Sequence, residues 1–227
     1  MLRPDFSDYV VHFTKDPSKE VKDKLERIPK EIKTLNAYDR LIKILKDRTI
    51  LGTEMKWTNE KAACFTECTW MSLLDHANNY SPYGIGFHKS LLFAAGGGPA
   101  IYLRPDLKKY QDDYIDEKAP LLKGRSFHPK LWAFVTPFVP EYAPREHMKK
   151  AGWIGTVVDY SHEREWRVPH ELNFTYNKVE FIILNTYEEM AKFPKDLKDE
   201  IGRDKFLLMD NFRQIEKLWP THKIQSF

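Results

Sequence analysis

The sequence predicts a single α+β domain over residues 1–227, with split or bent, mixed antiparallel β-sheets and flanking helices. Three observations lead to this prediction. The chain of 227 residues has the length of one domain. Its hydrophobic content of 42% and aromatic content of 14% can supply a packed core and exclude a disordered chain. Strand-like and helix-like segments are mixed without the strand–helix–strand rhythm of a parallel sheet.

The predicted strands are short runs rich in β-branched and aromatic residues. They are residues 9–14 (YVVHFT), 62–66 (AACFT), 83–87 (YGIGF), 99–105 (PAIYLRP), 130–138 (KLWAFVTPF), 163–169 (EREWRVP) and 178–185 (KVEFIILN). Two glycines lie inside YGIGF, and a glycine within a strand often marks a bulge or a close backbone approach.

The predicted helices have apolar residues at helical spacing or a strongly charged composition. They are residues 18–32, 37–53, 69–80 and 89–95, followed by a helical C-terminal tail over about 186–227. In the second of these, Leu41, Ile44 and Leu45 keep one face apolar and Gly52 marks the end. The tail contains one strand-like patch, KFLLM, at residues 205–209. Residues 105–130 are poorly patterned and predict an excursion over the surface.

Several classes of protein are disfavoured by the sequence. No apolar run approaches the roughly 20 residues that a membrane span needs, and the first residues, MLRPDFSDYVVHF, lack the order of a secretory signal. The cysteines, Cys64 and Cys68, are interpreted as reduced thiols. The histidines lack a spacing such as HExxH, and no GxSxG motif is present. We therefore expect a cytoplasmic protein without a metal and without a membrane partner.

Polar groups on three predicted strands suggest chemistry: His12, Thr66 and the pair Glu163 and Glu165. Buried polar groups need partners or a cleft. On an alternating strand, the two glutamates and Arg167 face the same side. One interpretation is a cleft shared by the three strands. The other is a ladder of salt bridges across strands, with the neighbouring tryptophan as a core anchor.

The order of these motifs resembles the histidine–aromatic–glutamate branch of the ADP-ribosyltransferase fold. The motifs are HFT at residues 12–14, CFTE at 64–67 and the late strand with its glutamates. A closer resemblance is to AbiGi-type abortive phage infection proteins, over about residues 9–185. It is carried by LIKIL, CFTE, HANNYSPYGIGFHK, GGPAIY and EREWR. The chain departs from the better-described transferases in having CFTE as its second motif and Phe13 beside the first-strand histidine.

The resemblance implies a toxin or phage-defence effector that transfers ADP-ribose from NAD to a nucleic acid (DNA or RNA) or a protein. It implies catalysis by Glu165 and His12, with Glu163 acting on the acceptor nucleophile; either glutamate could be the catalytic acid. Arg167 is implied to pair with an acid or to bind the pyrophosphate of NAD. The remaining contacts to NAD would come from His12, Phe13, Thr14, Phe65, Thr66 and Tyr83.

The partners implied are NAD, the acceptor, and a cognate antitoxin or a phage protein. The net charge of +3 permits an anionic partner without predicting one. The stretches FHKSLLF and LLKGRSFHPK could line a nucleic-acid groove, although solvated basic surface is the preferred interpretation. Two other functions stay open: a non-catalytic antitoxin or phage-sensing module that keeps the fold, and a nucleic-acid enzyme that does not use NAD.

Overall fold

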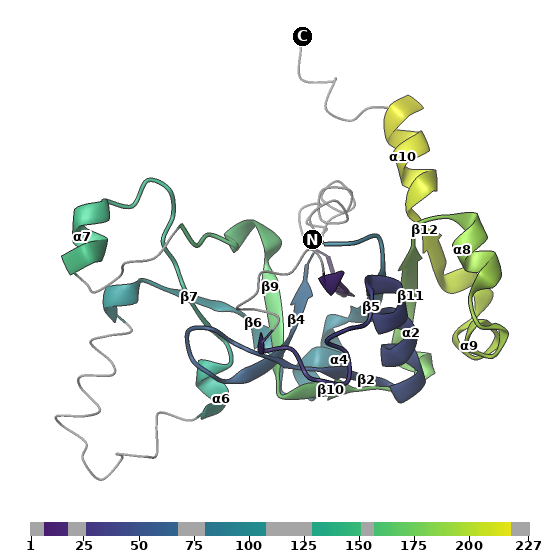
Figure 1. Cartoon of the computed structure of the whole chain (residues 1–227), viewed down its shortest axis with the longest axis horizontal. Helices are drawn as coiled ribbons and strands as arrows, with labels where there is room; N and C mark the ends of the chain where they lie inside the picture. The colour runs from purple at the N-terminus through teal and green to yellow at the C-terminus, as the bar shows by residue number, and fades with distance from the viewer. Residues whose placement is uncertain (1–6, 18–25, 68–79, 108–128, 151–156, 219–227) are drawn as a thin grey trace. The chain divides into compact units, whose positions relative to one another are not determined.

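The computed structural model describes residues 7–17, 26–67, 80–107, 129–150 and 157–218, and it has the predicted α+β composition with mixed sheets (Figure 1). Its contacts fall into two compact units. The first comprises Met1–Ile50, Phe65–Leu91 and Asn173–Phe227, and the second comprises Leu51–Cys64 and Leu92–Leu172. The prediction of a single domain stays a prediction. The helix expected over residues 69–80 and most of the one over 18–32 lie outside the described residues.

The sheet of the first unit contains four strands in the order β12, β11, β5 and β1, and Thr66 at the end of β4 pairs with Val11 of β1. The strands are β1 (Tyr9–Phe13), β4 (Lys61–Thr66), β5 (Gly84–His88), β11 (Val179–Leu184) and β12 (Phe206–Leu208). Strand β5 is antiparallel to both β1 and β11, whereas β12 is parallel to β11. The sheet is therefore mixed.

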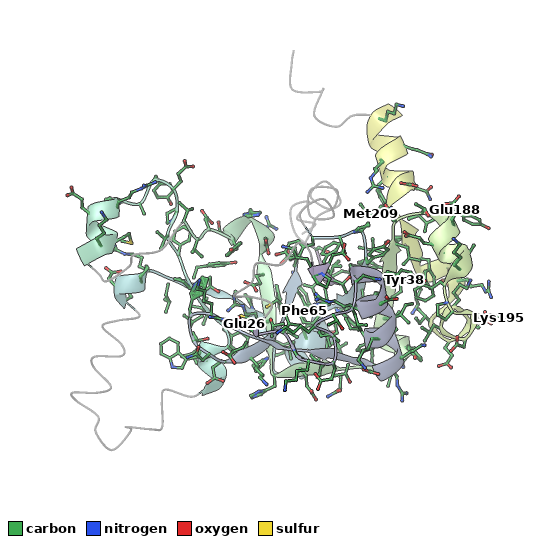
Figure 2. The ribbon with its side chains drawn as sticks, in the orientation of Figure 1. Glu26, Tyr38, Phe65, Glu188, Lys195 and Met209 are labelled. Atoms are coloured by element: carbon green, nitrogen blue, oxygen red, sulfur yellow. The ribbon has the colours of Figure 1, made fainter. Side chains whose placement is uncertain are left out.

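Close packing of a side chain against the backbone explains one glycine of the YGIGF strand. A Cβ on Gly86 would overlap the ring of Phe181, which lies on the neighbouring strand β11. Nearby, Val11, Phe13, Ile183 and Met209 form a buried apolar cluster (Met209 is labelled in Figure 2). The alternating strands β1 and β11 supply three of these four side chains, so sheet periodicity builds this part of the core.

The helices of the first unit begin and end at recognisable signals. They are α2 (Ala37–Asp47), α8 (Tyr187–Lys192), α9 (Lys195–Ile201) and α10 (Met209–Leu218), with the 3₁₀ turns η4 (Tyr176–Lys178) and η5 (Arg203–Lys205). Asn36 caps the start of α2, and Arg48 ends it in the left-handed region with φ of 53°. Thr186 and Glu189 form a capping box on α8.

The strand order in the sheet of the second unit is β3, β4, β9 and β6. Strands β7 and β8 form a separate parallel pair. The elements are β3 (Thr53–Glu54), β6 (Gly98–Pro99), β7 (Ile101–Leu103), α6 (Pro129–Trp132), β8 (Val135–Pro137), α7 (Arg145–Lys150), η3 (Ser161–Glu163) and β9 (Glu165–Pro169). Strand β4 and helix α4 (Lys89–Ala94) each contain a boundary between the units. So do the paired strands β2 (Thr49–Leu51) and β10 (Glu171–Asn173).

The sequence predictions for residues 37–53 and 130–138 were wrong in part. The helix predicted over 37–53 stops at Asp47, because Arg48 caps it and Thr49–Leu51, with two β-branched residues, forms β2. The strand predicted over 130–138 begins instead as helix α6. Pro129 occupies the first position of that helix, where its missing N–H costs nothing, and the strand β8 starts only at Val135.

Within the described part of the chain, no helix combines the length and the apolar character that crossing a membrane requires.

Candidate functional site

Glu165 and Arg167 form a paired group at the start of β9, in the second unit. Arg167 Nε donates to Glu165 Oε1 at 3.0 Å, and Arg167 Nη2 donates to Glu165 Oε2 at 2.8 Å. Two parallel bonds of this kind fix the plane of the carboxylate as well as its position. The Arg167 side chain is 5% exposed and that of Glu165 is 11% exposed. Glu165 therefore keeps limited access to solvent, while its partner is inside the protein.

The turn after α6 and the first residues of β8 supply the other contacts of Arg167. Its Nη1 donates to the backbone carbonyls of Ala133 at 3.2 Å and Val135 at 3.1 Å, and its Nη2 also donates to the hydroxyl of Thr136. Burial lowers the pKa of Arg167, but Cys64, Glu165 and Tyr102 together raise that pKa by more, so it lies above its ordinary value. The guanidinium therefore stays charged.

Tyr102 is a member of this group that the sequence did not single out. It lies on β7 directly opposite Thr136 of β8, and its hydroxyl donates to the carbonyl of Tyr160 at 2.9 Å. Burial first, and then the negative charge of Glu165, raise the pKa of Tyr102. The available signal was a tyrosine inside an apolar strand, since a buried phenol needs a polar partner.

The predicted position of Glu163 on the strand was wrong. Glu163 ends the 3₁₀ turn η3, and Arg164 follows it with φ of 46°, so β9 begins only at Glu165. The cause is local: the Asp159 carboxylate accepts bonds from the N–H and the hydroxyl of Ser161, which starts a turn instead of a strand. Glu163 and Glu165 therefore do not share one face of a strand.

His12 and Phe65 lie together in the first unit. His12 stands opposite Ile85 in the pairing of β1 with β5, and its ring centre is 5.7 Å from that of Phe65. His12 is half-buried, whereas Phe65 is 1% exposed and contacts the Phe87 ring edge-on (Figure 2 labels Phe65). The imidazole is thus the more accessible of the two side chains. The flat ring of Phe65 is a core side chain.

Thr14 is committed to internal hydrogen bonds. Its buried hydroxyl lies 2.8 Å from the carbonyl of Ala37 and 3.2 Å from that of Tyr83, while its own carbonyl accepts from the Ser81 hydroxyl at 2.7 Å. A hydroxyl has one proton to donate. The contacts therefore join the end of β1 to the start of α2 and to the turn before β5.

Tyr83 belongs to a different polar contact in the same unit. Its hydroxyl donates to Glu189 Oε1 at 2.6 Å, and the ring of Tyr38 stands edge-on at 5.6 Å (Tyr38 is labelled in Figure 2). Burial and then the bond to Glu189 raise the pKa of Tyr83. Of the other predicted NAD contacts, Phe13 belongs to the apolar cluster and Thr66 is buried.

The predicted site residues thus form one group around Glu165 and Arg167 and another around His12 and Phe65, each within its own unit. Thr14 and Tyr83 meet through the hydrogen bonds described above. Among the residues that the structure describes, no three His, Cys, Asp or Glu side chains are grouped so that they could hold a metal ion. Comparison of the chain with protein-family models, curated proteins and solved structures gave no match.

Proposed function

We propose that the chain is a cytoplasmic, NAD-dependent ADP-ribosyltransferase that acts as a toxin or phage-defence effector, with Glu165 as its catalytic glutamate. The observation that carries the proposal is the state of Glu165. Its carboxylate is held in one plane by Arg167 and still has 11% of its side chain exposed. A fixed and partly accessible carboxylate at the start of a strand is what the resemblance to the transferases requires of this residue.

The chemistry needs such a carboxylate. When the bond between the nicotinamide nitrogen and the ribose C1′ breaks, nicotinamide leaves with the bonding electrons and the ribose develops oxocarbenium character. A fixed negative charge stabilises that cation and reorganises little during the reaction. Each carboxylate oxygen has two lone pairs, so an oxygen that accepts a bond from Arg167 can also accept one from a ribose hydroxyl.

The acceptor then supplies a nucleophile that bonds to C1′ and loses a proton. Glu163, on the turn η3 and half-buried, would take that proton. The resemblance gives His12 the role of bonding the ribose through its imidazole. Thr14 would not share that role, because it uses its hydroxyl inside the protein. The acceptor would be a nucleic acid or a protein, and the partners would include a cognate antitoxin or a phage protein.

Release of nicotinamide from NAD by the purified protein tests the proposal. Three variants accompany the wild type: Glu165→Gln, Glu163→Gln, and Glu171→Gln as a control for the loss of an exposed carboxylate in the same unit. We expect release by the wild type and the control, and loss of at least about 100-fold in Glu165→Gln, as for removal of a key electrostatic group. A loss in Glu163→Gln with activity kept in Glu165→Gln would instead make Glu163 the catalytic glutamate.

A second candidate is the non-catalytic antitoxin or phage-sensing module. It is favoured by the ion pair that compensates the charge of Glu165, and by the burial of the Phe65 ring and the Thr14 hydroxyl. This candidate predicts no nicotinamide release and no shift of the melting temperature by NAD, together with tight association with a macromolecular partner. Nicotinamide release and the shift of the melting temperature by NAD separate the two candidates.

A further inference from the structure

We propose that Arg167 is a positioning residue that acts on the reaction through Glu165 and makes no contact with NAD. The inference rests on the proposed function, and it selects between the two roles that the sequence left open for this arginine. It goes further by assigning a supporting role to Thr136 and the turn between α6 and β8.

Arg167 has as many internal acceptors as it has N–H donors. A guanidinium carries five N–H groups in a fixed plane. The structure gives five acceptors: the two oxygens of Glu165, the carbonyls of Ala133 and Val135, and the hydroxyl of Thr136. Nε has one proton and one acceptor, and Nη1 and Nη2 have two protons and two acceptors each. Every donor of Arg167 is therefore used inside the protein.

A pyrophosphate would have to compete with the internal acceptors of Arg167. A pyrophosphate could bind Arg167 only by displacing one of these internal acceptors, in a side chain that is buried. A carbonyl that lost its bond there would be left buried and unsatisfied, which is unfavourable. The guanidinium, with every donor used, thus holds Glu165, and its plane is fixed by the carbonyl of Ala133 in the turn and that of Val135 in β8.

Lysine at position 167 could not make the same contacts. A lysine ammonium is a point charge on a flexible stem and has no planar fork. It could keep the charge beside Glu165 but could not make two parallel bonds while also reaching Ala133 and Val135. Charge alone is therefore insufficient, and Arg167→Lys should behave like the neutral Arg167→Met in orienting the carboxylate.

The test measures kcat and KM for NAD separately in nicotinamide release. The variants are Arg167→Met, Arg167→Lys, Glu165→Gln and the double variant of Arg167→Met with Glu165→Gln. Arg104→Met is the control, because Arg104 is an exposed arginine of the same unit that pairs with Asp106. Circular dichroism and the melting temperature report whether each variant is folded.

We expect both Arg167 variants to lose about 100-fold in kcat, the scale for a misplaced catalytic group, with KM for NAD within about threefold of wild type. The double variant should be no slower than Glu165→Gln alone, since Arg167 acts only through that carboxylate. If the Arg167 variants do not fold, Thr136→Val replaces them. It removes one acceptor and should lower kcat by about 3–10-fold without changing KM.

Three outcomes would overturn the inference. A KM for NAD raised more than tenfold with kcat retained would make Arg167 a ligand contact. An unchanged kcat in folded Arg167→Met would make the ion pair purely structural. A wild-type protein that releases no nicotinamide would overturn the proposed function and the inference together. The other two outcomes require an active wild type, so failure of the inference alone can be told from failure of the proposed function.

Discussion

Lys89 Nζ lies 2.7 Å from Glu67 Oε2, with both side chains almost completely removed from solvent. The other carboxylate oxygen of Glu67 accepts a bond from the Ser7 N–H at 3.2 Å. These two charges end the motifs CFTE and YGIGFHK, which lie far apart in the sequence. Lys89 is therefore an internal ion-pair partner. The preferred interpretation of FHKSLLF as solvated basic surface was wrong for this lysine, and Lys89 could not line a nucleic-acid groove either.

Removing both members of this ion pair should cost less stability than the two single removals added together. Lys89→Met or Glu67→Gln alone is expected to lower the free energy of unfolding by about 3–5 kcal/mol, because each leaves a buried charge or polar group without its partner. The double variant should lose less than the sum of the two. Urea unfolding measures all three.

The exposed pair between Lys43 and Asp47, at 2.8 Å, is the control. Lys43→Met should change the free energy of unfolding by no more than about 0.5 kcal/mol. Additive losses in the buried pair would contradict the coupling described above.

Tyr83 should make stability depend on pH at the alkaline end. Its pKa is raised in the folded protein, so the folded state holds the phenol proton more tightly than the unfolded state does. This contribution is fully present below the ordinary tyrosine pKa of about 10 and is lost as the pH rises toward the folded pKa. We expect Tyr83→Phe to lose about 1–2 kcal/mol at pH 7 through the missing bond to Glu189.

The difference between wild type and Tyr83→Phe should shrink as the pH rises above about 10. Chemical denaturation across that range measures it, and tyrosinate absorbance follows the late titration directly. Tyr187→Phe, at an exposed tyrosine, should show no such difference at any pH. A gap that stays constant with pH would show that the bond to Glu189 does not govern this titration.

Thr14 should prove to be a structural residue. Thr14→Val keeps the shape of the side chain but removes the proton that the carbonyls of Ala37 and Tyr83 share, so stability should fall by about 1–3 kcal/mol. In an active protein, KM for NAD should stay within about twofold of wild type. Thr49→Val, at an exposed hydroxyl that contacts Asn173, is the control and should cost less. A KM that rises sharply would return Thr14 to the role that the resemblance implied.

Gly97 and Gly98 should respond differently to the same change. A Cβ on Gly97 would lie 2.8 Å from the backbone oxygens of Arg167 and Leu92, whereas a Cβ on Gly98 would meet nothing nearer than Phe134 at 3.8 Å. Backbone atoms cannot move aside cheaply, so Gly97→Ala should lose about 1–3 kcal/mol and Gly98→Ala less than about 1 kcal/mol. Thermal unfolding compares the two, and equal effects would contradict the close approach of this turn to β9.

Sequence patterns located the elements that rest on local composition. Strands β1, β5 and β11 are rich in Val, Ile and Phe, and helix α2 has clear apolar spacing, so their periodicity was sufficient. The start of β9 was misplaced, because the alternation of charges in EREWR does not reveal that the Asp159 carboxylate nucleates a turn just before it.

The surroundings of Glu165 were only partly predictable. Its pairing with Arg167 follows from their spacing on one strand. The carbonyls of Ala133 and Val135 that complete the site leave no trace in a sequence, because every residue has a carbonyl. The same holds for the pairing of Glu67 with Lys89, since each motif shows a charge but not its partner.

The chain passes back and forth between its units, and this order affects folding during synthesis. The first unit is assembled from three separate stretches, and its strand β5 needs β1 on one side and β11 on the other. During synthesis β11 emerges long after β5, so the apolar strand at residues 84–88 waits with one edge uncovered. A product that stops before residue 179 would keep that edge open, and premature termination would thus yield a species prone to aggregation.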